Sequence, residues 1–128
     1  MASEQHLDGL SAINGWSVYV AAEDGGDFSK VGTSVRLDNR IVQLQNGNPR
    51  QLNIVASWHL NTRRDAMRLE QYVLARMGHL RLYNRDWIKC HHALLVGSVN
   101  DVIKKYRFVA RPSRTLASYD GADIGAWA

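Results

Sequence analysis

The chain has 128 residues, of which 45% are hydrophobic and 22% charged, and its formal net charge is +4. These proportions are typical of one folded domain and exclude the low-hydrophobicity, high-charge composition of disordered chains. A single cysteine, Cys90, excludes an internal disulfide framework and a zinc site built from several cysteines. No apolar run reaches the roughly 18 residues of a membrane span, and the first residues do not resemble a signal peptide. We therefore expect a soluble, cytoplasmic protein with no membrane partner.

The charges are unevenly distributed along the chain. Residues 30–114 contain all 16 basic residues and only five acids, whereas the first 29 residues contain five acids and no base. Twelve of the 16 cations are arginines, whose planar guanidinium suits phosphate oxygens. This pattern favours a polyanionic partner, most simply nucleic acid, although a solubilising surface explains the composition equally well.

The first half of the chain predicts a hairpin followed by a helix. Residues 16–22 and 28–33 are short segments rich in β-branched and aromatic residues, and the sequence Glu-Asp-Gly-Gly-Asp between them predicts a tight turn. Ser34 is a suitable helix N-cap, and Leu37, Ile41 and Leu44 then share one helical face. The Asn-Gly-Asn-Pro sequence that follows predicts the end of this helix.

The second half predicts a further strand and two helices. Apolar and polar residues alternate over 52–60, which indicates a half-buried strand. Thr62 and Asp65 resemble a capping box that opens a helix running to Gly78. Residues 87–90 are expected to form a short extended piece, and a final helix is expected at about 98–109. Mixed strands and helices predict an α+β fold with a small antiparallel sheet.

Glu70 is a candidate for chemistry because it interrupts an apolar helical face. At 100° per residue, Ala66, Val73 and Leu74 all fall close to it. An unpaired carboxylate in that setting is costly, so Glu70 is either part of an ion pair with an arginine or a metal ligand or acid/base group. The residue pattern alone leaves both interpretations open.

The predicted hairpin groups three further candidates. A two-residue turn makes paired residue numbers sum to an odd value, so Tyr19 faces either Lys30 or Gly32. Tyr19, Lys30 and Gly32 should therefore share one face of the sheet. Lys30 could equally be an ordinary surface lysine, and Gly32 could mark a bulge or a close approach by another backbone or a substrate.

The arginines and histidines supply weaker candidates. Arg40 flanks the apolar face of its helix and could bind phosphate or pair with an acid. Four arginines are expected on the surface as contacts for nucleic-acid backbone: Arg36, Arg50, Arg63 and Arg64. The adjacent Cys90, His91 and His92 cannot easily surround one zinc ion, so we do not interpret them as a metal site.

The order of these residues resembles the GIY-YIG endonuclease superfamily, in particular its compact phage and bacterial branch with a Lys-Val-Gly second motif. Ser-Val-Tyr at 17–19 stands where the first motif would be, and Lys-Val-Gly at 30–32 stands where the second would be. A helix carrying Arg40, an Asn-Gly-Asn-Pro turn and Glu70 after a leucine follow in the same order. The resemblance covers roughly residues 17–108.

The resemblance implies a three-stranded antiparallel sheet flanked by helices, which we place at residues 17–110 between an extension at 1–16 and a tail at 111–128. It implies a metal-dependent DNA endonuclease in which Glu70 binds a divalent cation, Mg²⁺ or Mn²⁺. Tyr19 and Lys30 would position or activate the attacking water, and Arg40 would offset charge on the phosphate. Gly32 would join the surface arginines in contacting DNA, and no small-molecule cofactor is expected. The alternatives are a catalytically silent nucleic-acid-binding module on the same fold and a protein-interaction domain for an acidic partner.

Overall fold

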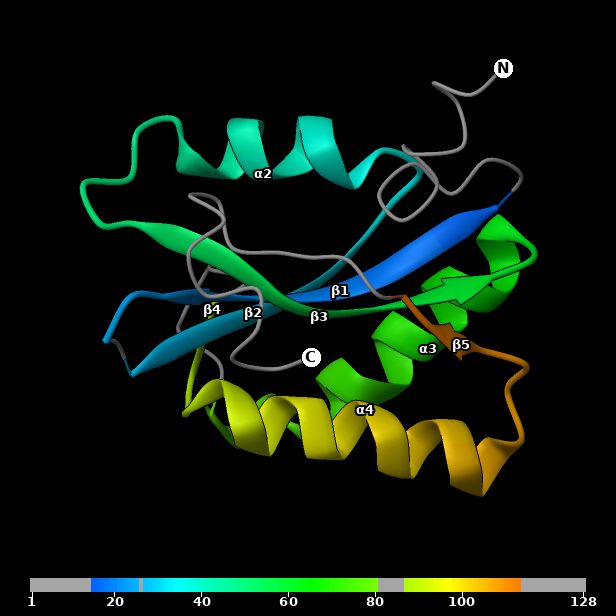
Figure 1. The fold of residues 1–128 in the computed structure, drawn as a ribbon. Helices are drawn as coiled ribbons and strands as arrows, with labels where there is room; N and C mark the ends of the chain where they lie inside the picture. The colour runs from blue at the N-terminus through cyan, green and yellow to red at the C-terminus, as the bar shows by residue number, and fades with distance from the viewer. Residues whose placement is uncertain (1–14, 26, 81–86, 114–128) are drawn as a thin grey trace, which may run out of the picture.

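A computed structural model describes residues 15–25, 27–80 and 87–113. The helices and strands, labelled as in Figure 1, occur in this order: β1 (Trp16–Glu23), β2 (Phe28–Ser34), α2 (Leu37–Gln45), β3 (Leu52–Leu60), α3 (Arg63–Arg76), a 3-10 turn (Gly78–Leu80), β4 (Trp87–Lys89), α4 (His92–Tyr106) and β5 (Arg111–Pro112). The fold is therefore α+β. Within the described ranges no helix combines the length and the apolar character that crossing a membrane requires.

The sheet has five strands in the order β4-β2-β1-β3-β5, and each neighbouring pair is antiparallel. The expectation of a three-stranded sheet is wrong, because β4 and β5 extend the three long strands at both edges. These two strands have only three and two residues, which is too short for any periodic pattern to reveal their pairing. The extended piece expected at 87–90 is present as β4, and β5 lies in the segment that had been assigned to the tail.

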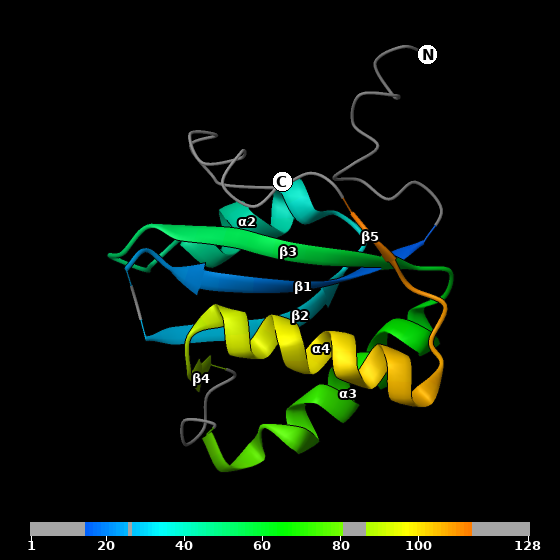
Figure 2. The same cartoon turned by 60° about the horizontal axis from the view of Figure 1, so that its bottom comes forward.

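The helices cover the two faces of the sheet, with α2 on one face and α3 and α4 on the other (Figures 1 and 2). The larger core lies under α3 and α4, where Val18, Val20 and Trp58 from the strands pack with Leu69 and Val99. Alternation along each strand sends the intervening residues to the other face.

The smaller core lies under α2. It contains Tyr19 and Ala21 of β1, Ile54 of β3 and Leu37 of α2, with two more helix residues packed against them. Those two, Ile41 and Leu44, complete the apolar face that the sequence predicts. We call the side of the sheet that carries Tyr19 the α2 face.

The predicted odd pairing sum of the hairpin is confirmed. Tyr19 pairs with Gly32 and Ala21 pairs with Lys30, so the paired numbers sum to an odd value. The turn sequence restricts the pairing to odd sums, which left Lys30 and Gly32 open as partners of Tyr19, and the structure shows that the partner is Gly32. The capping prediction for α3 is also confirmed, since the Thr62 side chain accepts a hydrogen bond from the Asp65 backbone N–H at 3.1 Å.

The boundaries of α4 differ from the expectation. The helix begins at His92 instead of about residue 98, and it ends at Tyr106 instead of 109. His91 is the N-cap, with its Nδ1 accepting from the Ala93 backbone N–H at 3.0 Å, and Arg107 closes the helix in the left-handed region at φ 59°. Histidine and arginine are unusual residues for these two positions, so the sequence carried no ordinary start or stop signal.

Candidate functional site

Tyr19 and Gly32 make the closest contact on the α2 face. The Tyr19 side chain is 1% exposed, and its ring and hydroxyl lie directly over Gly32, where a Cβ atom would stand 2.6 Å from the Tyr19 Cζ. The close approach that the sequence suggested at Gly32 is therefore made by a side chain of the same sheet. Gly32 itself is buried, so it does not present a surface to a partner.

Lys30 lies on the same face as Tyr19, two residue pairs further along the hairpin. It faces Ala21 on β1 and Trp87 on β4, and it is half-buried. Tyr19, Lys30 and Glu70 are each held by at least one hydrogen bond, ion pair, ring contact or electrostatic interaction, so Lys30 is not a lysine that only extends into solvent.

The α2 face also carries a polar residue paired with Tyr19 and, next to it, a polar row, and sequence reasoning missed both. Directly paired residues point to the same side of a sheet, so Ser57, the β3 partner of Tyr19, belongs to this face. The next row runs across four strands through Ser34, Ser17, His59 and Arg111. The alternation over residues 52–60 could have placed Ser57 and His59 on one side, but not on the side of Tyr19.

Ser57 is distinguished by its hydroxyl. The residue is 2% exposed, and its Oγ is buried without a hydrogen-bond partner among the residues that the structure describes. Burial, followed by the positive charge of Arg111, lowers the pKa of His59 below its ordinary 6.5. His59 is therefore a neutral imidazole near pH 7, able to accept or donate a hydrogen bond.

Arg40 approaches this face from the helix above it. On α2 it lies within about 60° of Leu37 and Leu44, both of which pack toward the sheet. Its Nε is buried, and within the described part of the chain it has no hydrogen-bond partner. Arg40 is thus the arginine that best fits a bound anion, because a buried N–H group without an acceptor costs about 1–3 kcal/mol.

Glu70 approaches from the other side of the sheet. It is half-buried on α3, next to the fully buried Ala66 and Val73, which belong to the core beneath α3 and α4. The structure therefore brings Tyr19, Lys30 and Arg40 to one face and places Glu70 on a helix that covers the opposite face (Figures 1 and 2).

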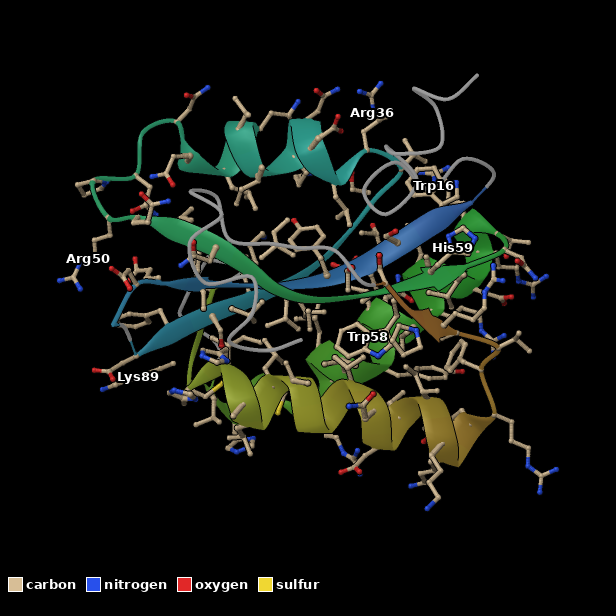
Figure 3. The ribbon with its side chains drawn as sticks, viewed as in Figure 1. Trp16, Arg36, Arg50, Trp58, His59 and Lys89 are labelled. Atoms are coloured by element: carbon tan, nitrogen blue, oxygen red, sulfur yellow. The ribbon has the colours of Figure 1, made fainter. Side chains whose placement is uncertain are left out.

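The expected surface arginines differ in their surroundings. Arg36 pairs with Asp38 at 3.0 Å, which also lowers the pKa of that carboxyl group. The Arg63 guanidinium lies 5.7 Å from the centre of the Trp16 ring. Arg50 and Arg64 are exposed, and Arg36 and Arg50 extend from opposite ends of the α2 face (Figure 3).

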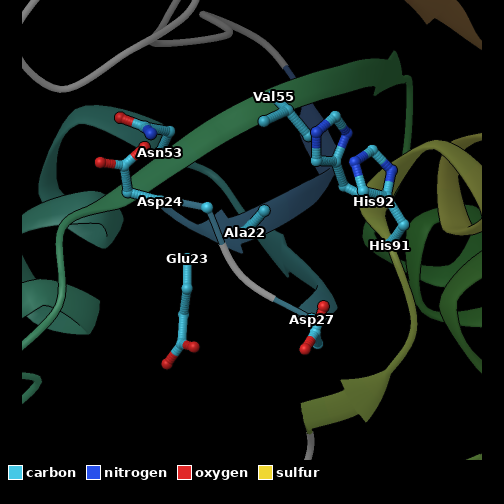
Figure 4. A pocket seen from close by; sticks show the side chains of 9 residues that line it. Ala22, Glu23, Asp24, Asp27, Asn53, Val55, His91 and His92 are labelled. Atoms are coloured by element: carbon cyan, nitrogen blue, oxygen red, sulfur yellow. The ribbon is translucent and has the colours of Figure 1, made fainter.

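A separate groove of about 320 Å³ lies at the hairpin turn. It is lined by the turn acids Glu23, Asp24 and Asp27 and by His91 and His92, whose rings lie 4.1 Å apart (Figure 4). Over the described ranges, no three histidine, cysteine or acidic side chains gather closely enough to hold a metal ion, in this groove or elsewhere.

The Cys-His-His sequence is likewise structural. Cys90 contacts Ser29, with the Cys90 sulfur 3.4 Å from the serine Oγ, and His91 caps α4. Cys90 and His91 therefore each have a local structural contact.

The chain matches the T5orf172 domain family over residues 17–109 and belongs to that family. No curated protein and no solved structure matches it. The resemblance to the GIY-YIG endonuclease superfamily is therefore corrected, because the matching family is a different one. The error arose because short motifs such as Ser-Val-Tyr and Lys-Val-Gly describe a β-hairpin as much as an active site. Membership in the T5orf172 domain family is compatible with a role connected to nucleic acid.

Proposed function

We propose that this T5orf172 domain binds nucleic acid and hydrolyses its phosphodiester bonds, with DNA as the substrate. The observation that carries the proposal is the buried Arg40 Nε, which lacks an acceptor among the described residues. A phosphate oxygen would satisfy this N–H group, and the fixed guanidinium charge would stabilise the charge that develops on a phosphate under attack.

The α2 face supplies two further groups for this reaction. Tyr19 is fixed by its packing on Gly32 and Leu37, so its hydroxyl has a defined position from which to orient a water molecule. Lys30, on the same face, adds a second positive charge beside the substrate.

Glu70 is the residue that would hold a divalent cation such as Mg²⁺ or Mn²⁺. Among the described residues, Glu70 is not grouped with two further side chains that could bind the same ion. It could therefore hold the ion only together with oxygen atoms of the substrate. Mg²⁺ accepts this arrangement because it commonly keeps several waters and binds one or two carboxylates together with substrate phosphates. When bound, the ion would polarise the phosphate and assist the leaving oxygen.

A plasmid-nicking assay with Mg²⁺, with Mn²⁺ and with a chelator tests the proposal through two variants. Glu70→Gln keeps the size of the side chain and removes its charge, so we expect loss of metal-dependent nicking with DNA affinity and melting temperature retained. Arg40→Leu should lower the cleavage rate about 100-fold while leaving stability unchanged or raised, because it removes a buried group that lacks an acceptor.

The matched control is Glu23→Gln, which removes a half-buried acid at the hairpin end. Wild-type nicking by Glu70→Gln would contradict the assignment of Glu70. A large fall in its melting temperature would instead identify Glu70 as one half of a structural ion pair.

A catalytically silent nucleic-acid-binding domain is the second candidate, and two observations favour it. Tyr19 is 1% exposed, and the helices that carry Arg40 and Glu70 cover opposite faces of the sheet. This candidate predicts salt-sensitive DNA binding without nicking under any metal condition.

A further inference from the structure

We propose that one end of the molecule binds an unpaired strand of nucleic acid by stacking bases on aromatic side chains that are flanked by arginine and lysine. We call it the arginine–aromatic end, and it comprises Trp16, Arg63, Arg68, Tyr72, Lys105, Tyr106 and Phe108. The proposal rests on the nucleic-acid part of the proposed function and deepens it by naming the form of the substrate. It does not depend on cleavage.

The chain topology assembles the first stack at this end. β1 begins at Trp16 directly opposite Leu60, where β3 ends. Only residues 61 and 62 separate β3 from α3, so the first residue of the helix, Arg63, returns to the start of β1. Its guanidinium carbon lies 5.7 Å from the centre of the Trp16 ring, within the range of a cation–π contact. Figure 3 shows Trp16 at this end of the sheet, near His59.

A second stack joins α3 to the end of α4. The Arg68 guanidinium carbon lies 5.6 Å from the Tyr72 ring and 5.8 Å from the Phe108 ring. Arg68 also donates a hydrogen bond to the Tyr72 hydroxyl at 3.1 Å. The Tyr72 ring lies 4.7 Å from that of Tyr106, and the Lys105 ammonium lies 5.4 Å from the Tyr106 ring.

The rings have two different roles. Tyr72 and Phe108 are half-buried and pack against the core, so their structural role is sufficient to explain them. Tyr106 packs against Tyr72 and is still 50% exposed, so part of its ring is accessible to a ligand. An exposed ring with a cation beside it is the arrangement on which a base can stack.

The charges around this end suit a polyanion. Arg63, Arg68, Lys105 and the helix-closing Arg107 are all exposed. The hairpin acids Glu23, Asp24 and Asp27 lie at the other end of β1, which runs the length of the sheet (Figures 1 and 4). A nucleic-acid strand would therefore be attracted to the arginine–aromatic end and repelled from the hairpin turn.

An unpaired strand fits better than a duplex. In a duplex the bases are stacked on one another, so only phosphates and base edges are accessible to a protein surface. Exposed aromatic rings add affinity only where a base is free to leave its neighbours, whereas arginine and lysine side chains serve either form.

Fluorescence anisotropy with labelled single-stranded oligo(dT), oligo(rU) and a duplex of equal length tests this inference on the full chain. We expect Tyr106→Ala to weaken single-strand binding about tenfold and duplex binding much less, and Tyr106→Phe to retain the wild-type affinity. The two single strands distinguish a DNA partner from an RNA partner.

Two controls accompany the Tyr106 variants, and each variant is checked by its melting temperature. Lys89→Ala removes an exposed charge far from Trp16 and His59 (Figure 3), and Val109→Ala trims a neighbouring side chain that is 73% exposed. An equal loss with Lys89→Ala, or no loss with folded Tyr106→Ala, would overturn the inference. The Tyr106 variants leave Arg40 and Glu70 unchanged, so a failure of the cleavage proposal and a failure of this inference are read from different variants.

Discussion

At the scale of single residues, the α2 face depends on the absence of a side chain at Gly32. A Cβ atom there would overlap the ring of Tyr19, which is buried under Leu37 and cannot easily withdraw. We expect Gly32→Ala to lower the free energy of unfolding by about 1–3 kcal/mol because the core becomes overpacked. Urea unfolding monitored by circular dichroism measures this change.

The control for that substitution is Gly97→Ala. Gly97 is exposed on α4, and a Cβ atom there would meet nothing within 4 Å. Alanine should therefore stabilise the helix by about 0.5–1 kcal/mol through its better helix propensity. If both substitutions changed stability in the same direction, packing on Tyr19 would not be the reason for the effect at Gly32.

His59 makes stability depend on pH. Burial and the Arg111 charge lower its pKa below the ordinary 6.5, and burial with the neighbouring His91 lowers that of His92 in the same direction. The unfolded chain therefore takes up protons at a higher pH than the folded one. The stability contributed by these neutral imidazoles is present above about pH 6.5 and is lost as the pH falls through the lowered folded pKa values.

We expect the free energy of unfolding to fall between about pH 7 and pH 5, and the double variant His59→Gln/His92→Gln to flatten this slope. Denaturant titrations at a series of pH values measure it. Asp38 does not interfere in this range, because its pKa lies below the ordinary 3.8 and its effect belongs to more acidic solutions. An unchanged slope in the double variant would assign the dependence to other groups.

At the scale of elements, the start of α3 depends on one side chain. The Thr62 hydroxyl accepts a hydrogen bond from the Asp65 backbone N–H. Removing the hydroxyl leaves this N–H group without its side-chain acceptor. We expect Thr62→Ala to cost about 1 kcal/mol, or about 4 °C in melting temperature, and Thr62→Ser to restore most of it. Equal melting temperatures for the alanine and serine variants would show that solvent replaces the cap.

Local signals explain which elements the sequence predicts well. The hairpin register and the start of α3 depend on residues within a few positions of one another, in the acidic turn and at Thr62. β4 and β5 depend instead on pairing with strands far along the chain, such as Phe28 with Lys89 and His59 with Arg111. A two- or three-residue strand has no periodicity of its own, so its place in the sheet follows from tertiary packing.

At the scale of the whole molecule, acidic and basic residues that are separated in the sequence also lie at opposite ends of the sheet. β1 runs from Trp16, near Arg63, to Glu23 at the acidic turn. We expect the logarithm of DNA affinity to fall linearly with the logarithm of salt concentration, by about 0.9 for each phosphate contacted on a duplex. Anisotropy titrations across a series of salt concentrations measure this slope.

Arg63→Ala and Arg64→Ala should each reduce that slope by about 1 if the side chain contacts a phosphate. Lys89→Ala is the control, because its side chain lies away from Trp16 and His59 (Figure 3). A flat salt dependence would count against a nucleic-acid partner altogether.

The sequence by itself determined the α+β class, the hairpin with Tyr19 and Lys30 on one face, and a basic stretch suited to a polyanion. Each of these follows from alternation, turn chemistry or composition. Alternation and turn chemistry depend on residues close in sequence, and composition does not depend on residue order. Only the tertiary structure decided that Arg40 and Glu70 lie on helices covering opposite faces, and that His59 and Ser57 join Tyr19. The physical reason is that helix amphipathicity indicates which side of a helix is buried but not which face of the sheet buries it. That choice depends on how all the apolar surfaces can be covered at once.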